Sequence, residues 1–490
     1  MSDCMQKTYQ SPRLLREMRL KEIDGSLLNE SDQIELHYER GCLLAELGRA
    51  AEANRVFQRI LAWDPMHWGA LTSLGDGFFS MHLRAEAREA YLEAVTRHPN
   101  NAKSHVNLAH LLRDCGEQTL ARYHYETALR LAPDEAGAHE GMVHLLMDLG
   151  EKEAAHQHLK QAFQNRAVTH FSYHGTGKPI AILVFIAGDG GDLPFHKLLD
   201  FGVFMVTTLA VEFHDPSVPL PPHHLIFNAI GDADLSGTAL TAAAKVLERI
   251  TSPVINPPSS VLATGRSTNA ERLAGVPGVV TPKIIRLSRE TLSESDAPAI
   301  LSNQGFDFPF LLRTPGFHTG RFFKYVERPD QMATALRELP GEDLAVIQFL
   351  NVRNADGKFR KYRVMMVNGK LYPLHAAVSR DWKVHYFSAD MVDHPEHRAE
   401  DATFLQNMPQ VIGEIGMKAL EKICNLQGLD YAGIDFSLSA TGELIVFEAN
   451  ATMTVLLPEQ GEKWNYRRTP VHRILNAVQQ MVVTRAKIES

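Results

Sequence analysis

A repeat of 34 residues dominates the first third of the chain and constrains its fold more than any other sequence feature. Small, aromatic, glycine and proline residues each recur at this interval: Ala53, Ala87, Ala121 and Ala155; Phe57, Tyr91, Tyr125 and Leu159; Gly48, Gly116 and Gly150, with His82 at the second glycine position; and Pro65, Pro99 and Pro133. Small alanines let paired helices approach closely, aromatic residues fill the groove between them, and proline ends the second helix. The period therefore predicts stacked helix pairs.

This pattern resembles the tetratricopeptide repeat. We count four repeats, 34–67, 68–101, 102–135 and 136–166, after an N-terminal segment, 1–33, in which a helix is expected from Arg13 to Leu28. The resemblance implies an all-α solenoid that binds a peptide or protein partner, or associates with a second copy. The equal alternative is that the solenoid only braces the rest of the chain.

Length and composition are those of a multidomain globular protein. A chain of 490 residues is expected to hold about two to four domains, and 44% hydrophobic with 22% charged residues is typical of a soluble globular protein. The net charge of −8 argues against nucleic acid or a membrane surface as the main partner. Because no signal segment or apolar run of membrane-spanning length occurs, we expect a cytoplasmic protein. Its four scattered cysteines lack a CxxC pair and no histidine is spaced for zinc, so reduced thiols are expected.

Beyond Arg166 the sequence changes to short apolar runs. Strands are predicted at 180–186, 203–209 and 224–230, and a helix at 235–250. This alternation predicts a small, largely parallel α/β subdomain over 178–255. The loop Ala187 to Asp192 follows the first strand and is placed to hold a substrate, although it lacks the GxGxxG spacing of dinucleotide-binding loops.

The part from 256 to 485 is expected to mix helices and strands. A short helix is predicted at 268–273, strands at 308–313, 322–326 and 344–350, and a helix at 330–339. The loop from Thr314 to Gly320 lies between two of these strands and contains glycines. Such a loop can point backbone N–H groups at phosphate oxygens, although similar sequences also occur in ordinary turns.

A predicted hairpin carries the clearest chemical signal. Its first strand is 432–438, with Asp435 at mid-strand. Its second strand is 444–449, which carries Glu448 near its end and is followed by Asn450. Asp435 and Glu448 should lie nearly opposite each other, with Asn450 on the same face as Glu448. Carboxylates in such apolar strands are costly to bury unless they are paired or bind a cation. Three hard oxygen ligands predict Mg²⁺ or Mn²⁺ together with a nucleoside triphosphate, and the alternative is a hairpin with acids at solvated ends.

A basic run, KFRKYR, precedes this hairpin at 358–363. It leads into a predicted strand at 362–367 that is closed by a type I′ turn at Asn368-Gly369. Lys361 and Arg363 share one face of that strand. They form either a clamp on phosphate oxygens or a solvated edge strand, and the nearby acidic cluster favours the clamp.

Residues 178–485 resemble the ATP-grasp superfamily of carboxylate–amine ligases, in particular the branch of glutathione synthetase and the ribosomal-protein glutamate ligase. The motif GIDF…VFEAN matches that family's metal ligands at Asp435, Glu448 and Asn450. Arg363 matches the catalytic arginine that the glutamate-ligase branch places over the phosphate. The resemblance further implies nucleotide binding by Arg266, Arg313, His318, Gly320, Gln348, Phe349, Leu350 and Lys361.

The sequence departs from that family at several positions. Arg313 stands where the family has a nucleotide-binding lysine, and Arg266 falls near an earlier family lysine. Gln348 to Leu350 fall where the family's hinge contacts adenine, and the acidic residue that usually precedes this segment is absent. Gly433 replaces an arginine that some other ligases carry two residues before the metal-binding aspartate.

The resemblance implies a multidomain protein, with an all-α solenoid followed by an α+β ATP-grasp fold, that acts as an ATP- and Mg-dependent ligase. Phosphorylation of a substrate carboxylate would give an acyl-phosphate, and attack by an amine would give an amide with release of ADP and phosphate. The substrates are expected to be peptide- or protein-borne, and a homo-oligomer is possible. The alternatives are a nucleotide-binding scaffold without turnover and a phosphotransferase that stops at a phosphoester.

Overall fold

The computed structural model describes residues 12–27, 33–81, 83–163, 166–317, 321–384, 389–458 and 462–486. The chain divides into two compact units. The first unit is Met1–Ile180 with Phe201–Val206, and the second unit is Ala181–Asp200 with Thr207–Ser490.

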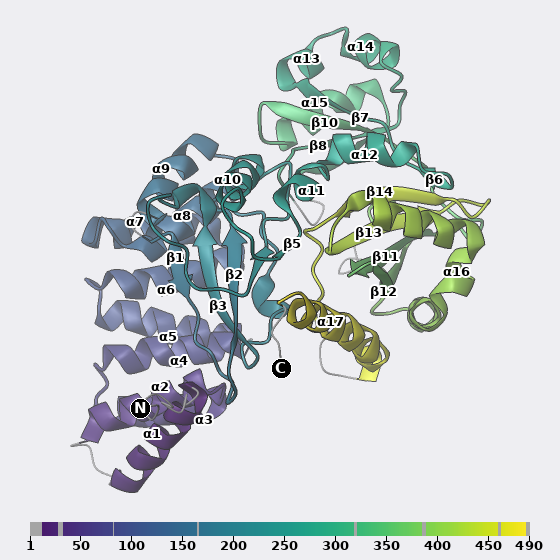
Figure 1. The fold of residues 1–490 in the computed structure, drawn as a ribbon. Coiled ribbons are helices and arrows are strands. Elements are labelled where there is room, and N and C mark those ends of the chain that lie inside the picture. The colour runs from purple at the N-terminus through teal and green to yellow at the C-terminus, as the bar shows by residue number, and fades with distance from the viewer. Residues whose placement is uncertain are drawn as a thin grey trace. The chain divides into compact units, whose positions relative to one another are not determined.

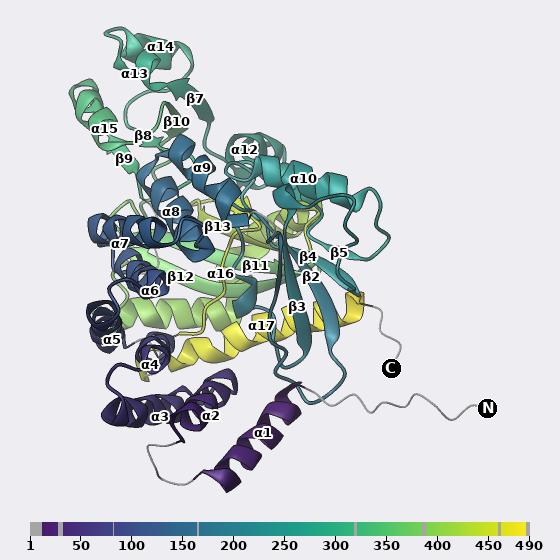
Figure 2. The same cartoon turned by 90° about the vertical axis from the view of Figure 1, so that its left-hand side faces the viewer.

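The first unit contains a stack of helix pairs that matches the predicted repeats (Figures 1 and 2). Helix α1 (Pro12–Ser26) precedes the pairs α2 (Ile34–Glu46) and α3 (Ala50–Trp63), α4 (Trp68–Ser80) and α5 (Arg84–Arg97), α6 (Ala102–Asp114) and α7 (Gln118–Leu131), and α8 (Ala136–Leu149) and α9 (Lys152–Phe163). The prolines follow the second helix of the first three pairs, as predicted. Gly48, Gly116 and Gly150 end the first helices with φ near +80°, whereas His82 lies outside the described residues.

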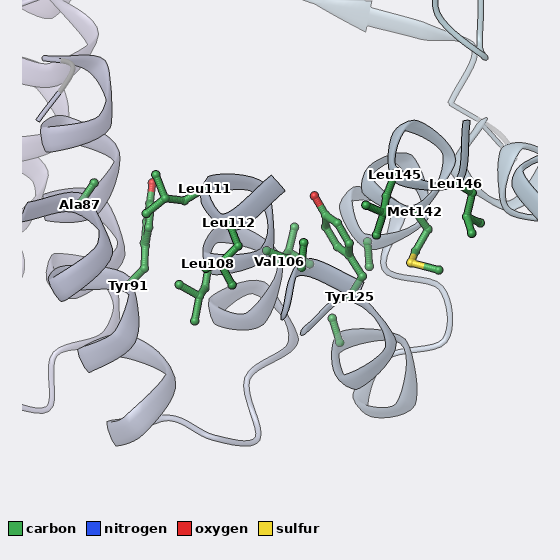
Figure 3. Packing of buried hydrophobic residues seen from close by; sticks show 14 of the residues in the cluster. Ala87, Tyr91, Val106, Leu108, Leu111, Leu112, Tyr125, Met142, Leu145 and Leu146 are labelled. Atoms are coloured by element: carbon green, nitrogen blue, oxygen red, sulfur yellow. The ribbon is translucent and has the colours of Figure 1, made fainter. Parts of the chain in front are cut away.

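Tyr91 and Tyr125 belong to one buried cluster of the second to fourth repeats, together with leucine and alanine residues (Figure 3). The four repeated alanines are buried, and so are Tyr91 and Tyr125. A Cβ atom on Gly75 would lie 2.4 Å from Cε1 of Tyr91, and one on Gly141 would lie 2.2 Å from Cε1 of Tyr125. The approach of each aromatic ring therefore depends on the absence of a side chain opposite it.

A five-stranded sheet follows the repeats, in the order β1-β3-β2-β4-β5. Its strands are β1 (Val168–His170), β2 (Ile180–Ile186), β3 (Phe204–Ala210), β4 (Leu225–Asn228) and β5 (Val254–Ile255), with short 3₁₀ helices at Phe195–Lys197 and Val211–Phe213 and helix α10 (Gly237–Leu247) between strands. Strands β2, β4 and β5 are parallel. Strands occur at all three predicted positions, and the parallel pairing of β2 with β4 agrees with the prediction.

A four-stranded antiparallel sheet comes next in the second unit, with the order β7-β10-β8-β9. It comprises β7 (Ile284–Ser288), β8 (Phe310–Arg313), β9 (Phe323–Val326) and β10 (Asp343–Gln348), accompanied by α11 (Pro258–Leu262), α12 (Arg266–Ala274), α13 (Arg289–Ser293), α14 (Ala297–Asn303), a 3₁₀ turn at Pro329–Gln331 and α15 (Met332–Glu338). Strand β10 ends two residues earlier than predicted, so Phe349 and Leu350 follow the strand.

The last sheet has the order β12-β11-β13-β14-β6. It consists of β6 (Val279–Val280), β11 (Phe359–Val367), β12 (Lys370–Ser379), β13 (Tyr431–Leu438) and β14 (Leu444–Asn450), with α16 (Pro395–Gln427), a 3₁₀ turn at Glu462–Trp464 and α17 (Asn465–Arg485). Positive φ angles at both Asn368 and Gly369 confirm the type I′ turn. Helices α16 and α17 contact this sheet (Figure 1). A helical repeat is thus followed by mixed sheets, and no described helix is long and apolar enough to cross a membrane.

Candidate functional site

The hairpin of β13 and β14 places its polar residues as the sequence predicts. Asp435 is the direct cross-strand partner of Glu448, and Gly433 is the partner of Asn450. The register shifts immediately after Asp435, which marks a β-bulge at this point. The acidic pair therefore lies where the regular hydrogen-bond ladder is interrupted, and a bulge there changes the direction of the neighbouring side chains.

Asp435 is buried, and two cations from strand β11 contact it. Nε and Nη2 of Arg363 donate to its two carboxylate oxygens at 2.5 and 2.7 Å. Nζ of Lys361 lies 3.0 Å from Oδ2, which confirms that Lys361 and Arg363 share a face. Burial by itself would raise the pKa of Asp435, but the charges of Arg363 and Lys361 outweigh it and lower the pKa well below its usual range. Asp435 is therefore ionised.

Glu448 has a cationic partner of its own. Nη2 of Arg266 donates to Glu448 Oε1 at 2.6 Å, and Nδ2 of Asn450 donates to the same oxygen at 2.8 Å. The amide oxygen of Asn450 instead accepts from N and Oγ1 of Thr452 at 3.1 and 2.9 Å. The backbone N–H of Arg266 also donates to Asp234 at 2.9 Å. This arrangement ties the start of helix α12 to the end of strand β14.

A cavity of about 490 Å³ lies beside the hairpin within the second unit. Its volume falls in the range of roughly 300–1,000 Å³ that is typical of small-molecule sites. Nine of the residues predicted for the site line it: Arg266, Arg313, Gln348, Phe349, Leu350, Lys361, Arg363, Asp435 and Glu448. The structure therefore brings together residues from five separate stretches of the sequence.

Of the predicted site residues that the structure describes, only Asn450 does not line this cavity. Asn450 lines an adjacent small cavity of about 30 Å³, together with Arg266 and Glu448. The expectation that Asn450 converges on one spot with both acids is therefore only partly correct, because its amide nitrogen rather than its oxygen faces Glu448. His318 and Gly320 lie outside the described residues.

Arg313, at the end of β8, lies beside the same cavity in a buried environment. Its guanidinium donates to the carbonyl oxygen of Phe317 and lies 5.6 Å from the ring centroid of Phe323. Burial, together with the charge of Arg266, lowers the pKa of Arg313 to about 10. Arg313 still carries its charge at neutral pH.

Gly433 has a structural reason to lack a side chain. A Cβ atom at this position would lie 2.6 Å from Sδ and 2.9 Å from Cβ of Met453. An arginine at position 433 would therefore collide with the segment that follows β14, and Arg363 has no second guanidinium beside it from this position.

The comparisons with known proteins concern the helical part. The sequence profile of the tetratricopeptide repeat matches residues 102–135, which is the third predicted repeat. The N-terminal helix pairs form a tetratricopeptide-repeat domain. The chain is similar to the solved structures of MamA from Desulfovibrio magneticus RS-1, with 20% identity over 30% of this chain and 84% of that chain (TM-score 0.27), and of YrrB, a TPR protein with an unusual peptide-binding site, with 14% identity over 30% and 73% (TM-score 0.25). No curated protein sequence matches the chain.

Outside the tetratricopeptide-repeat domain, two aromatic residues of the cavity wall, Phe323 and Trp382, were not assigned to the site from the sequence. The ring of Trp382 lies 5.4 Å from that of Phe323 and 6.3 Å from that of Phe349, between ring centroids. Ile284, Leu311 and Ile347 extend this apolar wall. Leu311 and Ile347 were open to prediction, because they are register partners in adjacent strands and point to the same face of the sheet. Trp382 lies in a loop without periodicity, so no local pattern indicated it.

Acidic residues after the first strands of the second unit also went unassigned. Asp192, in the loop predicted to hold a substrate, lines the cavity. Both of its oxygens accept from the N–H of Ala187, at 3.0 and 3.2 Å. Burial, with Glu212 and Asp189 nearby, raises the pKa of Asp192 to about 8 although the bond from Ala187 opposes the rise. Burial likewise raises the pKa of Glu212.

Proposed function

We propose that the second unit is an ATP-grasp module that binds a nucleoside triphosphate with Mg²⁺ or Mn²⁺ and joins a carboxylate to an amine. In this proposal the tetratricopeptide-repeat domain binds a protein partner or a protein-borne substrate. One observation carries it: a single cavity has an apolar, aromatic wall beside Arg266, Arg313, Lys361 and Arg363 and beside the pair Asp435 and Glu448. An apolar slot next to clustered cations suits a base linked to phosphates.

The residues fit a divalent cation by donor type and placement. Asp435 and Glu448 supply hard oxygen ligands from paired positions on neighbouring strands. Both accept hydrogen bonds from cations, but a carboxylate has about four acceptor sites. Asp435 accepts three donors from Arg363 and Lys361, so a lone pair stays available for a metal. Asn450 would join as a ligand after rotation of its amide, since O and N occupy similar positions.

When bound, the nucleotide with its metal supplies the phosphoryl group that activates a carboxylate. In the proposal Arg363 and Lys361 hold negative charge in place, which is the main requirement of phosphoryl transfer. Arg313 and Arg266 contribute further positive charge. The aromatic wall at Trp382 keeps water from the reacting groups.

Asp192 is our candidate to receive a proton from the amine. It lines the same cavity, and its pKa of about 8 lies near the pH at which a general base works best. Asp192→Asn is expected to lower kcat and to flatten the pH profile between 7 and 9. An unaltered profile would remove Asp192 from this role.

Thermal unfolding with Mg-ATP, Mg-ADP or Mg²⁺ alone tests the proposal most directly. Ligand at 100 times its Kd should stabilise the second unit by about 2.7 kcal/mol. Glu448→Ala should weaken the shift, whereas Glu443→Ala, on the same hairpin but outside the cavity lining, should leave it intact. No shift at millimolar nucleotide in the wild-type chain would overturn the proposal.

Product analysis separates the proposal from its alternatives. Acids and amines are screened for ADP release, and the products are identified by mass. An amide supports the ligase, a stable phosphoester supports a phosphotransferase, and nucleotide binding without ADP release supports a scaffold. Ligation by a chain lacking residues 1–166, with an unchanged KM for a protein-borne substrate, would remove the repeats from substrate binding.

A further inference from the structure

Two histidine pairs occupy the same place in the third and fourth repeats. Nδ1 of His105 in α6 lies 3.0 Å from Nδ1 of His124 in α7, and Nδ1 of His139 in α8 lies 2.8 Å from Nδ1 of His158 in α9. Each pair joins the two helices of one repeat. The members of each pair are 19 residues apart, so the sequence does not display them as a metal-binding motif.

The outer nitrogen of one ring in each pair is fixed by the backbone. Nε2 of His105 lies 2.9 Å from the carbonyl oxygen of Pro99, and Nε2 of His139 lies 2.8 Å from that of Pro133. A carbonyl oxygen only accepts hydrogen bonds, so Nε2 carries the proton in the neutral ring. The Nδ1 lone pair therefore points at the partner ring. The same arrangement, with the far N–H bound to a carbonyl, orients histidines that bind metals.

Two Nδ1 lone pairs at this distance repel each other unless a proton or a metal cation lies between them. In the neutral pair it is the Nδ1 proton of His124 or His158, which makes an ordinary N–H···N hydrogen bond at these distances. If that proton moves to Nε2 of the same ring, both Nδ1 lone pairs face each other without loss of a proton from the pair. His124 and His158 are only partly buried, so solvent can carry this transfer.

We propose that each pair is a two-histidine site for a borderline transition-metal dication such as Ni²⁺, Cu²⁺ or Zn²⁺. Imidazole nitrogens bind Zn²⁺ at about 2.0–2.1 Å, which in a tetrahedral arrangement separates two ligand nitrogens by about 3.3 Å. The pairs would open by less than about 0.6 Å to reach this spacing. Water or an anion completes the coordination.

The first two repeats supply an internal contrast. Their equivalent positions hold His37 with Val56, and Leu71 with Ala90. These repeats form the same helix pairs without two facing imidazoles. The histidine pairs are therefore not required to close a helix pair, which favours a binding role over a packing role.

The test is metal binding by the full-length chain at pH 7.5, measured calorimetrically with Ni²⁺ and by the nitrogen hyperfine pattern of bound Cu²⁺. The variants are His124→Gln, His158→Gln and the double variant. Glutamine can still donate to His105 or His139, so the hydrogen bond between the helices is kept while one metal ligand is lost. His98→Gln serves as the matched control, because His98 contacts the carbonyl oxygen of Met66 instead of a second histidine.

Each single variant should lose one equivalent of bound metal, the double variant two, and His98→Gln none. The Cu²⁺ spectrum should show two imidazole nitrogens in the wild-type chain and lose that pattern in the double variant. Other groups, such as His394, Glu396 and His397, contribute equally to every sample and cancel in the difference. Unchanged stoichiometry in the correctly folded single variants would overturn the proposal and leave the pairs as holders of a shared proton only.

Discussion

Arg363 and Asp435 face each other across strands β11 and β13 as register partners, and the guanidinium holds both carboxylate oxygens at 2.5 and 2.7 Å. Lys361 approaches the same carboxylate from two residues earlier on β11. Asp435 thus pairs with two cations at the wall of the large cavity, and the three groups together keep a net positive charge. The stability of the second unit and the charge of its cavity both depend on this one carboxylate.

Asp435→Asn is expected to destabilise the second unit by about 3 kcal/mol, at the lower end of the range for breaking a buried ion pair. Arg363 and Lys361 keep side-chain exposures of 20% and 14%, so water partly compensates the loss. Urea unfolding measures the effect. Glu414→Gln, which breaks the exposed pair with Lys418, should leave the unfolding curve unchanged. Equal curves for both variants would contradict this role of Asp435.

Two glycine substitutions should change the stability of the first unit in opposite directions. Gly75→Ala puts a Cβ atom 2.4 Å from the buried ring of Tyr91, and such overpacking costs about 1–3 kcal/mol. Gly25→Ala in α1 meets nothing within 4 Å and should gain up to about 1 kcal/mol of helix propensity. Differential scanning calorimetry measures both. A stabilised Gly75→Ala variant would show that the Tyr91 ring can move away.

The histidine pairs should make the repeats sensitive to acid in metal-free buffer. Burial and the neighbouring His105 lower the pKa of His124 from its usual value near 6.5 to about 4. Between these values the unfolded chain binds more protons than the folded chain, so the free energy of unfolding falls as the pH drops from 6.5 to 4. Burial and His139 lower the pKa of His158 in the same direction.

Urea unfolding followed by circular dichroism at pH 7 and pH 5 measures this loss of stability. His124→Gln should reduce the difference between the two pH values, because glutamine does not titrate, whereas His98→Gln should leave the difference as it is. An identical pH dependence in the wild type and His124→Gln would exclude His124 as a source of the effect.

Trp382 should report on ligand entry into the large cavity. It contributes to the cavity wall, so bound nucleotide is expected to change its fluorescence. The change should disappear in Trp382→Phe and persist in Trp464→Phe, whose indole packs with a separate cluster around Ala377. A nucleotide signal that survives in Trp382→Phe would place the ligand elsewhere.

The helical repeats were predictable because their physical requirements recur at a fixed interval. Position 75 needs no side chain and position 91 needs a ring, and the same complementarity links Gly41 to Phe57. Local signals also sufficed for the hairpins: alternation and a positive-φ turn determine which residues face one another. The opposition of Asp435 and Glu448 follows from such local information.

Other features depend on contacts that no local pattern encodes. Arg266 reaches Glu448 across 182 residues of sequence, and Trp382 reaches Phe349 from an irregular loop. The amide orientation of Asn450 depends on Thr452, which competes for its oxygen. Histidine pairs 19 residues apart meet only because a tight turn folds one helix back on the other. Local sequence patterns and the family resemblance therefore identified nine residues that line the large cavity, but not the partners of their charges.

Helix α17, the last described element of the chain, contributes Arg467 and Tyr466 to the buried carboxylate of Asp401, at 3.5 and 2.7 Å, and Arg467 donates to the carbonyl oxygen of Leu374 in β12. A growing chain can assemble its repeats one at a time as they leave the ribosome, because each repeat contacts mainly its neighbours. The last sheet cannot assemble in such steps, because its packing depends on contacts from helix α17. Asp401 in α16 lacks these partners until Tyr466 and Arg467 have been synthesised, so a nascent chain would carry a complete solenoid before the last sheet could pack.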